Sequence, residues 1–183
     1  MAGRIRARRH LLRDGAALAL AGGAPAALAD DAPPPLAPEI RLVPPAAEFT
    51  YEAIVEIAPT IAIGAAPLGT RAMVPILGGK FAGPRLSGRV LPGGADRQLL
   101  RPDGVKLLDA LYELQTDDGA VITVRNRVLI DAPPGGPRYA FSMLDITAPE
   151  GPHAWLNRGV FVGTLHGLMP QRQAVLIRVF RVV

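Results

Sequence analysis

Glycine and proline are so frequent beyond residue 29 that they limit the length of every helix the chain could form. This part of the sequence contains 16 of the 20 glycines and 18 of the 19 prolines. Glycine costs a helix backbone entropy, and proline removes a hydrogen-bond donor. Outside residues 1–29, only the stretch around Val105 to Leu111 has helix-like spacing. The sequence therefore predicts an all-β domain of short strands.

The clearest strand begins near Glu48, where apolar residues occupy alternate positions through Ile57. Asp118-Gly119, between two apolar runs, is the strongest hairpin signal. Eight or nine short strands at this spacing are typical of a sandwich or a barrel. Beyond the first strand, we expect strands over residues 60–63, 71–77, 85–91, 106–116, 120–131, 138–146, 159–166 and 173–182.

The first 29 residues have the features of an export signal. A basic front containing Arg8-Arg9 precedes a short apolar run, and Ala27 and Ala29 bracket a cleavage site. Residues 7–13 resemble the twin-arginine export consensus, which predicts the twin-arginine translocation machinery as a partner and a periplasmic or secreted location. We expect a signal peptide over 1–29, a Pro/Ala-rich spacer over 30–47 and a barrel domain over 48–183. The alternative is an uncleaved leader that tethers the protein to the membrane.

Charge and cysteine content exclude several classes of partner and site. The predicted leader holds five of the 20 basic residues and one of the 16 acidic residues, so 15 of each remain. A balanced domain lacks the net positive charge that supports nucleic-acid binding. The absence of cysteine rules out disulfides and thiolate chemistry. We expect no nucleic-acid partner and, after cleavage, no stable membrane insertion.

Common catalytic and cofactor motifs are missing. Gly79-Lys80 is followed by Phe81, which denies a phosphate loop its hydroxyl. His153 and His166 lack the spacing of metal ligands, and no serine lies in a GxSxG motif. The sequence therefore predicts neither a cofactor nor a metal site.

Four polar or aromatic residues are candidates for a functional site, and for most of them a structural interpretation is also open. Asp96 and Asp103 lie in a polar stretch between strands, where they could pair with neighbouring arginines; alternatively, Asp96 points into a cavity as a general acid or base. Asn126 falls on the apolar face of its strand and needs a partner there. Trp155, the only tryptophan, is a core anchor or the wall of a pocket.

Several ordered motifs together resemble the uncharacterised domain-of-unknown-function 3237 family. They include Pro75 to Pro84, Gly88 to Asp96, Arg101-Pro102-Asp103-Gly104 and Trp155-Leu156-Asn157-Arg158. The resemblance covers about residues 49–182. It implies a closed or nearly closed antiparallel β-barrel similar to allene oxide cyclase and dirigent proteins, whose barrels hold small hydrophobic molecules. The family positions that match are Arg71, Asp96, Asp103, Tyr112, Trp155 and Asn157.

The chain departs from the family pattern at three candidate pocket positions. Arg97 stands where the family usually has Trp, Leu111 where it has Arg, and Ile146-Thr147 where it has a Phe-Glu pair. A family activity that relied on that Arg or Glu would be lost or redirected here.

Two hypotheses for function follow. The first is an exported β-barrel that binds a small hydrophobic molecule without turnover; the alternative is an isomerase- or cyclase-like enzyme acting on a carbonyl or phenolic compound. In the enzyme, Asp96 and Tyr112 would hold or exchange a proton. An accessory or structural role and a homo-oligomer stay open. The predicted ligand-binding residues are Arg71, Asp103, Asn126, Trp155 and Asn157.

Overall fold

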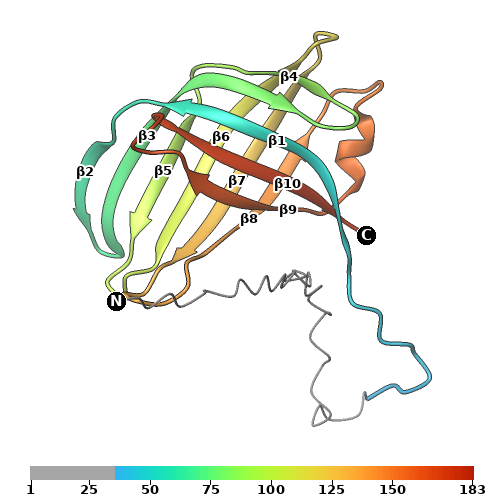
Figure 1. Cartoon of the computed structure of the whole chain (residues 1–183), viewed down its shortest axis with the longest axis horizontal. Helices are drawn as coiled ribbons and strands as arrows, with labels where there is room; N and C mark the ends of the chain where they lie inside the picture. The colour runs from blue at the N-terminus through green and yellow to red at the C-terminus, as the bar shows by residue number, and fades with distance from the viewer. Residues whose placement is uncertain (1–35) are drawn as a thin grey trace, which may run out of the picture. The chain divides into compact units, whose positions relative to one another are not determined.

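A computed structural model describes residues 36–183 of the chain. The predicted leader and the first part of the predicted spacer lie outside these residues. The described part contains ten strands and one short 3-10 helix (Figure 1). The elements are β1 (Ala47–Ile57), β2 (Ile61–Ala66), β3 (Gly69–Ala82), β4 (Ser87–Val90), β5 (Ala95–Leu100), β6 (Lys106–Thr116), β7 (Val121–Asp131), β8 (Tyr139–Thr147), η1 (Ala154–Arg158), β9 (Phe161–Gly167) and β10 (Ala174–Val182).

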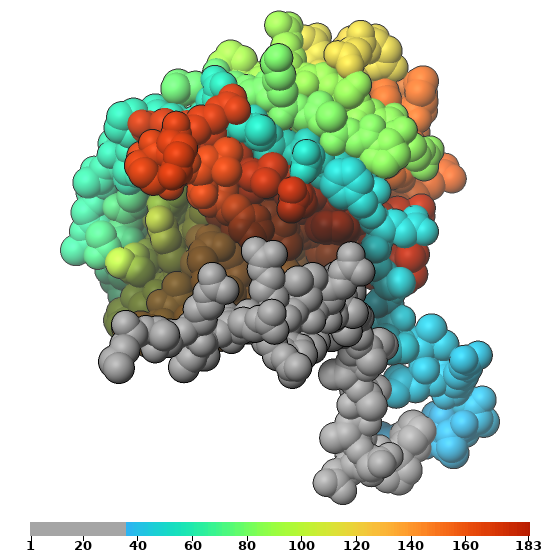
Figure 2. All heavy atoms as spheres, viewed as in Figure 1, coloured from blue at the N-terminus to red at the C-terminus, as the bar shows by residue number. Residues whose placement is uncertain are grey.

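The strands close into an eight-stranded antiparallel barrel, which confirms the predicted fold. Closure comes from β1, which pairs with β10 on one side and with β3 on the other. Figure 2 shows β1 in cyan beside β10 in red on the face toward the viewer. Between β3 and β6, β4 and β5 lie one after the other, and β2 pairs only with β3.

Glycines let β3 and β4 approach their neighbours closely. A Cβ at Gly79 would lie 2.1 Å from the carbonyl oxygen of Ile54, and one at Gly88 would lie 2.1 Å from that of Gln115. Gly79 also has a φ of 146°, which favours glycine. These glycines therefore bend strands, as the barrel hypothesis expected. Gly78-Gly79 was however predicted to end a strand, and the structure continues β3 through it.

The sequence prediction missed two local elements. The polar stretch around Asp96, expected to lie between strands, contains the strand β5, in which the inward positions Asp96 and Gln98 alternate with Arg97 and Leu99. The helix-like spacing from Val105 to Leu111 falls within β6, in agreement with the strand predicted over residues 106–116. The helix η1 was not predicted. The Asp118-Gly119 hairpin is present, with the Gly119 N–H donating to the Thr116 carbonyl at 2.9 Å.

One apolar core fills much of the barrel. Its fully buried members come from strands all around the wall and from η1, and they include Tyr51, Leu114, Ile122, Leu156 and Phe161. Within residues 36–183, no helix combines the length and apolar character needed to cross a membrane.

Candidate functional site

A row of inward-facing residues brings two polar side chains into the lumen. Asp96 on β5 pairs in register with Ala110 on β6, and Ala110 pairs with Asn126 on β7. Residues directly opposite each other on neighbouring strands project to the same face of a sheet. Asp96 and Asn126 therefore lie two strands apart on the inner wall, with only the small Ala110 between them.

Asp96 is a buried carboxyl held by two donors. The Gln98 side-chain amide donates to its Oδ2 at 2.6 Å, and the Asp109 backbone N–H donates to its Oδ1 at 3.1 Å. Its side chain has no ion pair in the described residues, in contrast to the arginine pairing that was one interpretation of the sequence. Burial raises the pKa of Asp96, and the Gln98 hydrogen bond opposes this shift without cancelling it.

Other buried polar atoms in the same half of the lumen have no partner in the described residues. They are Asn126 Oδ1 and Ser142 Oγ, together with the Tyr112 hydroxyl, which lies beside the equally buried Tyr51 hydroxyl. Burial also raises the pKa of Tyr112, so this phenol remains neutral and does not act as a base. A buried polar atom without a partner costs free energy, and such atoms are commonly explained by a water or a ligand.

The polar half of the lumen contains a cavity of about 70 Å³. Asp96, Gln98, Tyr112 and Asn126 contribute its polar lining, and the rest is apolar. Leu100, the last residue of β5 and two residues beyond Gln98, is 47% exposed, so the strand reaches solvent close to the cavity. A water molecule's share of liquid volume is about 30 Å³, so the cavity has room for roughly two waters or for a small part of a larger guest.

Four predicted site residues lie away from this cavity. Arg71 is exposed on β3, and Asp103 is exposed in the turn after β5, where it pairs with Arg101 and accepts a hydrogen bond from the Val105 N–H at 3.2 Å. Asn157 is bonded through both amide atoms to the Ala148 backbone, at 2.8 and 2.9 Å. Trp155 lines a separate small pocket.

Three of the four departing residues point away from the lumen, contrary to the sequence prediction that these are pocket positions, and the fourth, Ile146, is buried in the apolar core. Arg97, Leu111 and Thr147 are all exposed on the outer face of the barrel. Strand parity explains the difference, because each lies next to an inward-facing residue and so projects outward.

Two polar residues of the inner wall were missed from the sequence. Gln98 orients Asp96, and Ser142 faces inward from β8, in register with Val128. A period of two counted from Asp96 would have placed Gln98 on the same face, had β5 been recognised as a strand.

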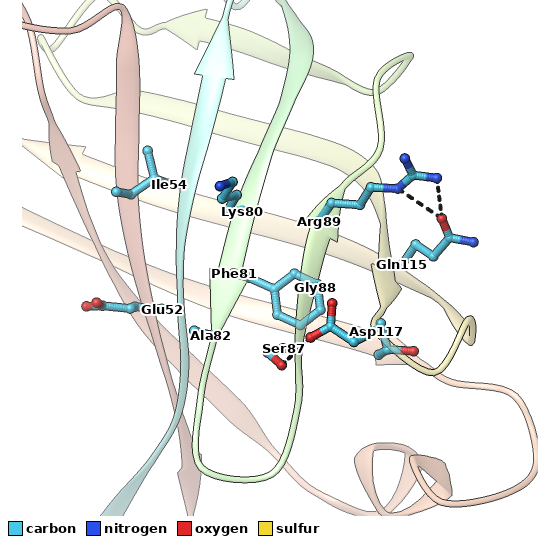
Figure 3. Close-up of a pocket in the computed structure, with 11 residues that line it drawn as sticks. Glu52, Ile54, Lys80, Phe81, Ala82, Ser87, Gly88, Arg89, Gln115 and Asp117 are labelled. Atoms are coloured by element: carbon cyan, nitrogen blue, oxygen red, sulfur yellow. Dashed lines mark hydrogen bonds between the residues drawn. The ribbon is translucent and has the colours of Figure 1, made fainter.

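A second hollow lies on the outer surface over β1, β3, β4 and β6, with a volume of about 630 Å³ (Figure 3). Its polar side chains are largely engaged with one another. Arg89 donates twice to the Gln115 side chain, at 2.6 and 3.0 Å, and Ser87 donates to Asp117 at 2.5 Å. Within residues 36–183, no three His, Asp or Glu side chains are grouped as metal ligands.

Comparison with known proteins places these features in a family context. The profile of the family described as "Protein of unknown function (DUF3237)" matches residues 45–182. A UPF0311 protein of Rhodopseudomonas palustris is 40% identical over 79 residues, which are 43% of this chain and 52% of that protein. The chain thus spans about half the length of the first curated relatives it matches.

Two further relatives align over more of the chain. A protein of Penicillium herquei named "Hydroalkoxylation enzyme phnH" is 30% identical over 124 residues, which are 68% of this chain and 76% of that protein. A crystal structure of a conserved protein of unknown function from Rhodopseudomonas palustris has a TM-score of 0.71 and 30% identity, covering 78% of this chain and all of the other.

Proposed function

The chain belongs to the family "Protein of unknown function (DUF3237)", and we propose that its barrel is an enzyme that adds a hydroxyl group across a carbon–carbon double bond within one small, largely apolar molecule. One observation carries the proposal: Asp96 is a buried carboxyl in the lumen, and burial raises its pKa. A carboxyl whose pKa is raised keeps its proton to higher pH than an ordinary carboxyl, which suits it to donate that proton. The similarity to a protein named as a hydroalkoxylation enzyme supports this reaction class.

The proposed reaction needs only a proton and a substrate that carries both a hydroxyl and an alkene. Asp96 donates its proton to one alkene carbon, which breaks the π bond. The substrate hydroxyl oxygen attacks the other carbon and forms the new C–O bond. Its proton then returns to the Asp96 carboxylate, so the product is an isomer of the substrate and the enzyme is regenerated.

The other polar groups of the cavity are suited to positioning. Asn126 Oδ1 has no partner among the described residues and is available to accept a hydrogen bond from the substrate hydroxyl. The neutral Tyr112 hydroxyl would donate to the same oxygen once it turns away from the neighbouring Tyr51 hydroxyl. Gln98 and the Asp109 N–H fix the carboxyl, so its remaining freedom is small. Such fixed geometry is a main source of rate enhancement.

The size of the cavity favours the enzyme over a carrier. Sites that enclose a whole small molecule typically measure about 300–1,000 Å³. The lumen cavity, at about 70 Å³, holds only the reacting end of a substrate, and the remainder would lie outside it. A carrier without turnover would need to enclose more of its guest.

The test uses 2-(3-methylbut-2-enyl)phenol and 2-allylphenol as probe substrates for the purified protein. Chromatography with mass spectrometry would separate the cyclic ether from its isomeric phenol. In D₂O the product should carry one deuterium on carbon, because the added proton exchanges with solvent on Asp96. Replacing Asp96→Asn should lower the rate by about 10²-fold or more, the usual contribution of a general acid.

Asp103→Asn is the matched control, because it makes the same change in an exposed acid outside the lumen. Its rate should equal that of the wild type. The proposal is overturned if neither probe is converted, or if Asp96→Asn and Asp103→Asn turn over equally fast.

We also propose that the protein acts after export through the twin-arginine machinery. The basis is the pair Arg8-Arg9 ahead of a short apolar run. Replacing both arginines by lysine should keep the full-length protein in the cytoplasm, as measured by cell fractionation and intact mass. Unchanged export of that variant would contradict the proposal.

A further inference from the structure

A second small pocket lies where β1 begins, β10 ends and η1 meets the β3–β4 turn. Its volume is about 70 Å³, and it shares no lining residue with the lumen cavity. Its charged lining is Arg85, Arg181 and Glu48, and its aromatic lining is Trp155 and Phe49. Two guanidinium groups and one carboxylate therefore face one space, which leaves a net positive charge.

Arg85 is held by an aromatic ring. Its Cζ lies 4.0 Å from the centroid of the Trp155 ring, within the range of a cation–π contact. Stacking on a ring uses the face of a guanidinium and leaves the N–H groups along its edge free to donate. Arg85 has no hydrogen bond or ion pair in the described part of the chain. Its donors are thus oriented and available.

Arg181 contributes a buried donor that has no partner. Its Nε is shielded from solvent and finds no acceptor within residues 36–183. Gly159 lies against this atom, since a Cβ built on Gly159 would be 3.1 Å from Nε. The terminal Nη groups of Arg181, which lines the pocket, also make no hydrogen bond or ion pair in the described residues, so these are the donors that an acceptor in the pocket would meet.

The Glu48 carboxylate, which lies next to the two arginines, does not act as their hydrogen-bond acceptor. Glu48 pairs in register with Arg181 across β1 and β10, yet it makes no ion pair with either arginine in the described residues. The two guanidiniums therefore keep unused donors. Because Arg presents its N–H groups in a planar fork, it matches the oxygens of carboxylates and phosphates.

We propose that this pocket, lined by Arg85, Arg181 and Trp155, binds a small oxyanion, either free phosphate or the carboxylate of a small acid. The volume admits one such group and excludes a nucleotide or a peptide. The anion would accept hydrogen bonds from both guanidiniums at the edge of the Trp155 ring. This site is independent of the proposed lumen chemistry.

The single tryptophan makes the proposal directly measurable. Trp155 is the only tryptophan in the chain, so intrinsic fluorescence reports on this pocket alone. The full chain would be titrated with inorganic phosphate, and separately with benzoate, at constant ionic strength kept by sodium chloride. We expect a saturable change in fluorescence for at least one of the two anions, and the responsive anion identifies which source the site accepts.

Variants separate a built site from general salt effects. Arg85→Gln and Arg181→Gln should each weaken binding by about tenfold or more, as loss of a charge-assisted hydrogen bond does. Glu48→Gln should tighten it, because it removes the competing carboxylate. Arg178→Gln, on the same strand but outside the pocket, and Asp96→Asn, in the lumen, should bind as the wild type does. Equilibrium dialysis provides a second readout, since Arg85→Gln alters the baseline fluorescence.

Two results would overturn the proposal. The first is the absence of saturable binding of both anions to the wild type. The second is equal affinity of Arg85→Gln and Arg178→Gln, which would assign the signal to ionic strength rather than to the pocket. Circular dichroism would verify that each variant is folded before its affinity is compared.

Discussion

The two halves of the barrel lumen are built from the same alternating strands, yet only one half is filled. In the half near η1, Leu114, Ile122, Leu156 and Phe161 are at most 2% exposed and pack into one cluster. In the other half, Asp96, Asn126 and Ser142 take positions where apolar side chains would complete the core. Asp96 and Asn126 line the cavity, and Ser142 lies one strand beyond, in register with the cavity-lining Val128.

This difference indicates that one half of the lumen stabilises the fold and the other half carries the candidate functional groups. The filled half supplies the packing that closes the barrel, and the polar half carries groups whose burial opposes folding. Proteins commonly lose stability at sites where polar groups are pre-positioned for a ligand. Here the two tasks fall on neighbouring segments of the same strands, because β6 carries Leu114 at one end and Leu108 beside the cavity.

The largest expected effect comes from truncating the filled half. Leu114→Ala should lower the free energy of unfolding by about 2–5 kcal/mol, because a fully buried leucine leaves a cavity that its neighbours cannot fill. Urea denaturation would measure this loss. Leu108→Ala is the matched control beside the existing cavity, and it should cost less because water can enter the enlarged space. An equal or greater loss for Leu108→Ala would contradict the contrast between the halves.

Replacing a buried polar side chain of the polar half with an apolar one should raise the free energy of unfolding. Asn126→Leu replaces a buried, unpartnered amide oxygen with an apolar group of similar size, and we expect a gain in unfolding free energy of about 1–3 kcal/mol. Turnover of the prenylated phenol should be lost at the same time. Stability and activity would be measured on the same preparation.

Asn157→Leu is the control for this change, because both amide atoms of Asn157 are bonded to the Ala148 backbone. Removing those bonds should destabilise the protein by about 1–3 kcal/mol. If Asn126→Leu were as destabilising as Asn157→Leu, the lumen amide would have a structural role. The burial of polar groups in this half would then not oppose folding.

Asp96 gives the polar half a distinctive pH dependence. Because its pKa is raised in the folded state, the native protein retains a proton that the unfolded chain releases. The stabilising contribution is complete below the ordinary aspartate pKa of about 3.9 and is lost as the pH rises through the raised pKa. As the pH rises through this range, the free energy of unfolding of the wild type should therefore fall relative to that of Asp96→Asn. The urea midpoints of the two proteins, measured at several pH values, would show this. A parallel pH profile for the two proteins would contradict the raised pKa.

Local patterns in the sequence were sufficient to predict much of the barrel wall. The strands β6 and β7 are long, alternate cleanly and join at Asp118-Gly119, so every signal they need lies within one stretch of chain. The strand β5 was missed because its inward positions, Asp96 and Gln98, are polar. The residues that make the cavity chemically useful are the ones that break the apolar alternation of the strand.

The candidate site could be predicted only in part, because it depends on barrel closure. Asp96, Tyr112 and Asn126 meet across registers that span three strands, whereas Arg71, Asp103 and Asn157 fall on the outer wall or in connections. Register and closure are set by pairings distant in sequence, such as β1 with β3. A single sequence contains no local signal for these pairings.

The smallest expected effect comes from a charge on the outer face of the wall that holds Asp96. Asp109 accepts two hydrogen bonds from Arg125, at 2.7 and 2.9 Å, and this bonding lowers the pKa of Asp109. Both side chains are about half exposed, so solvent screens the pair. Asp109→Asn should leave the urea midpoint close to the wild-type value at neutral pH. Its backbone N–H would still donate to Asp96, so the pH window of Asp96 should persist, shifted slightly down because a nearby negative charge is gone. Loss of that window in Asp109→Asn would show that the outer charge, rather than burial in the lumen, raises the pKa of Asp96.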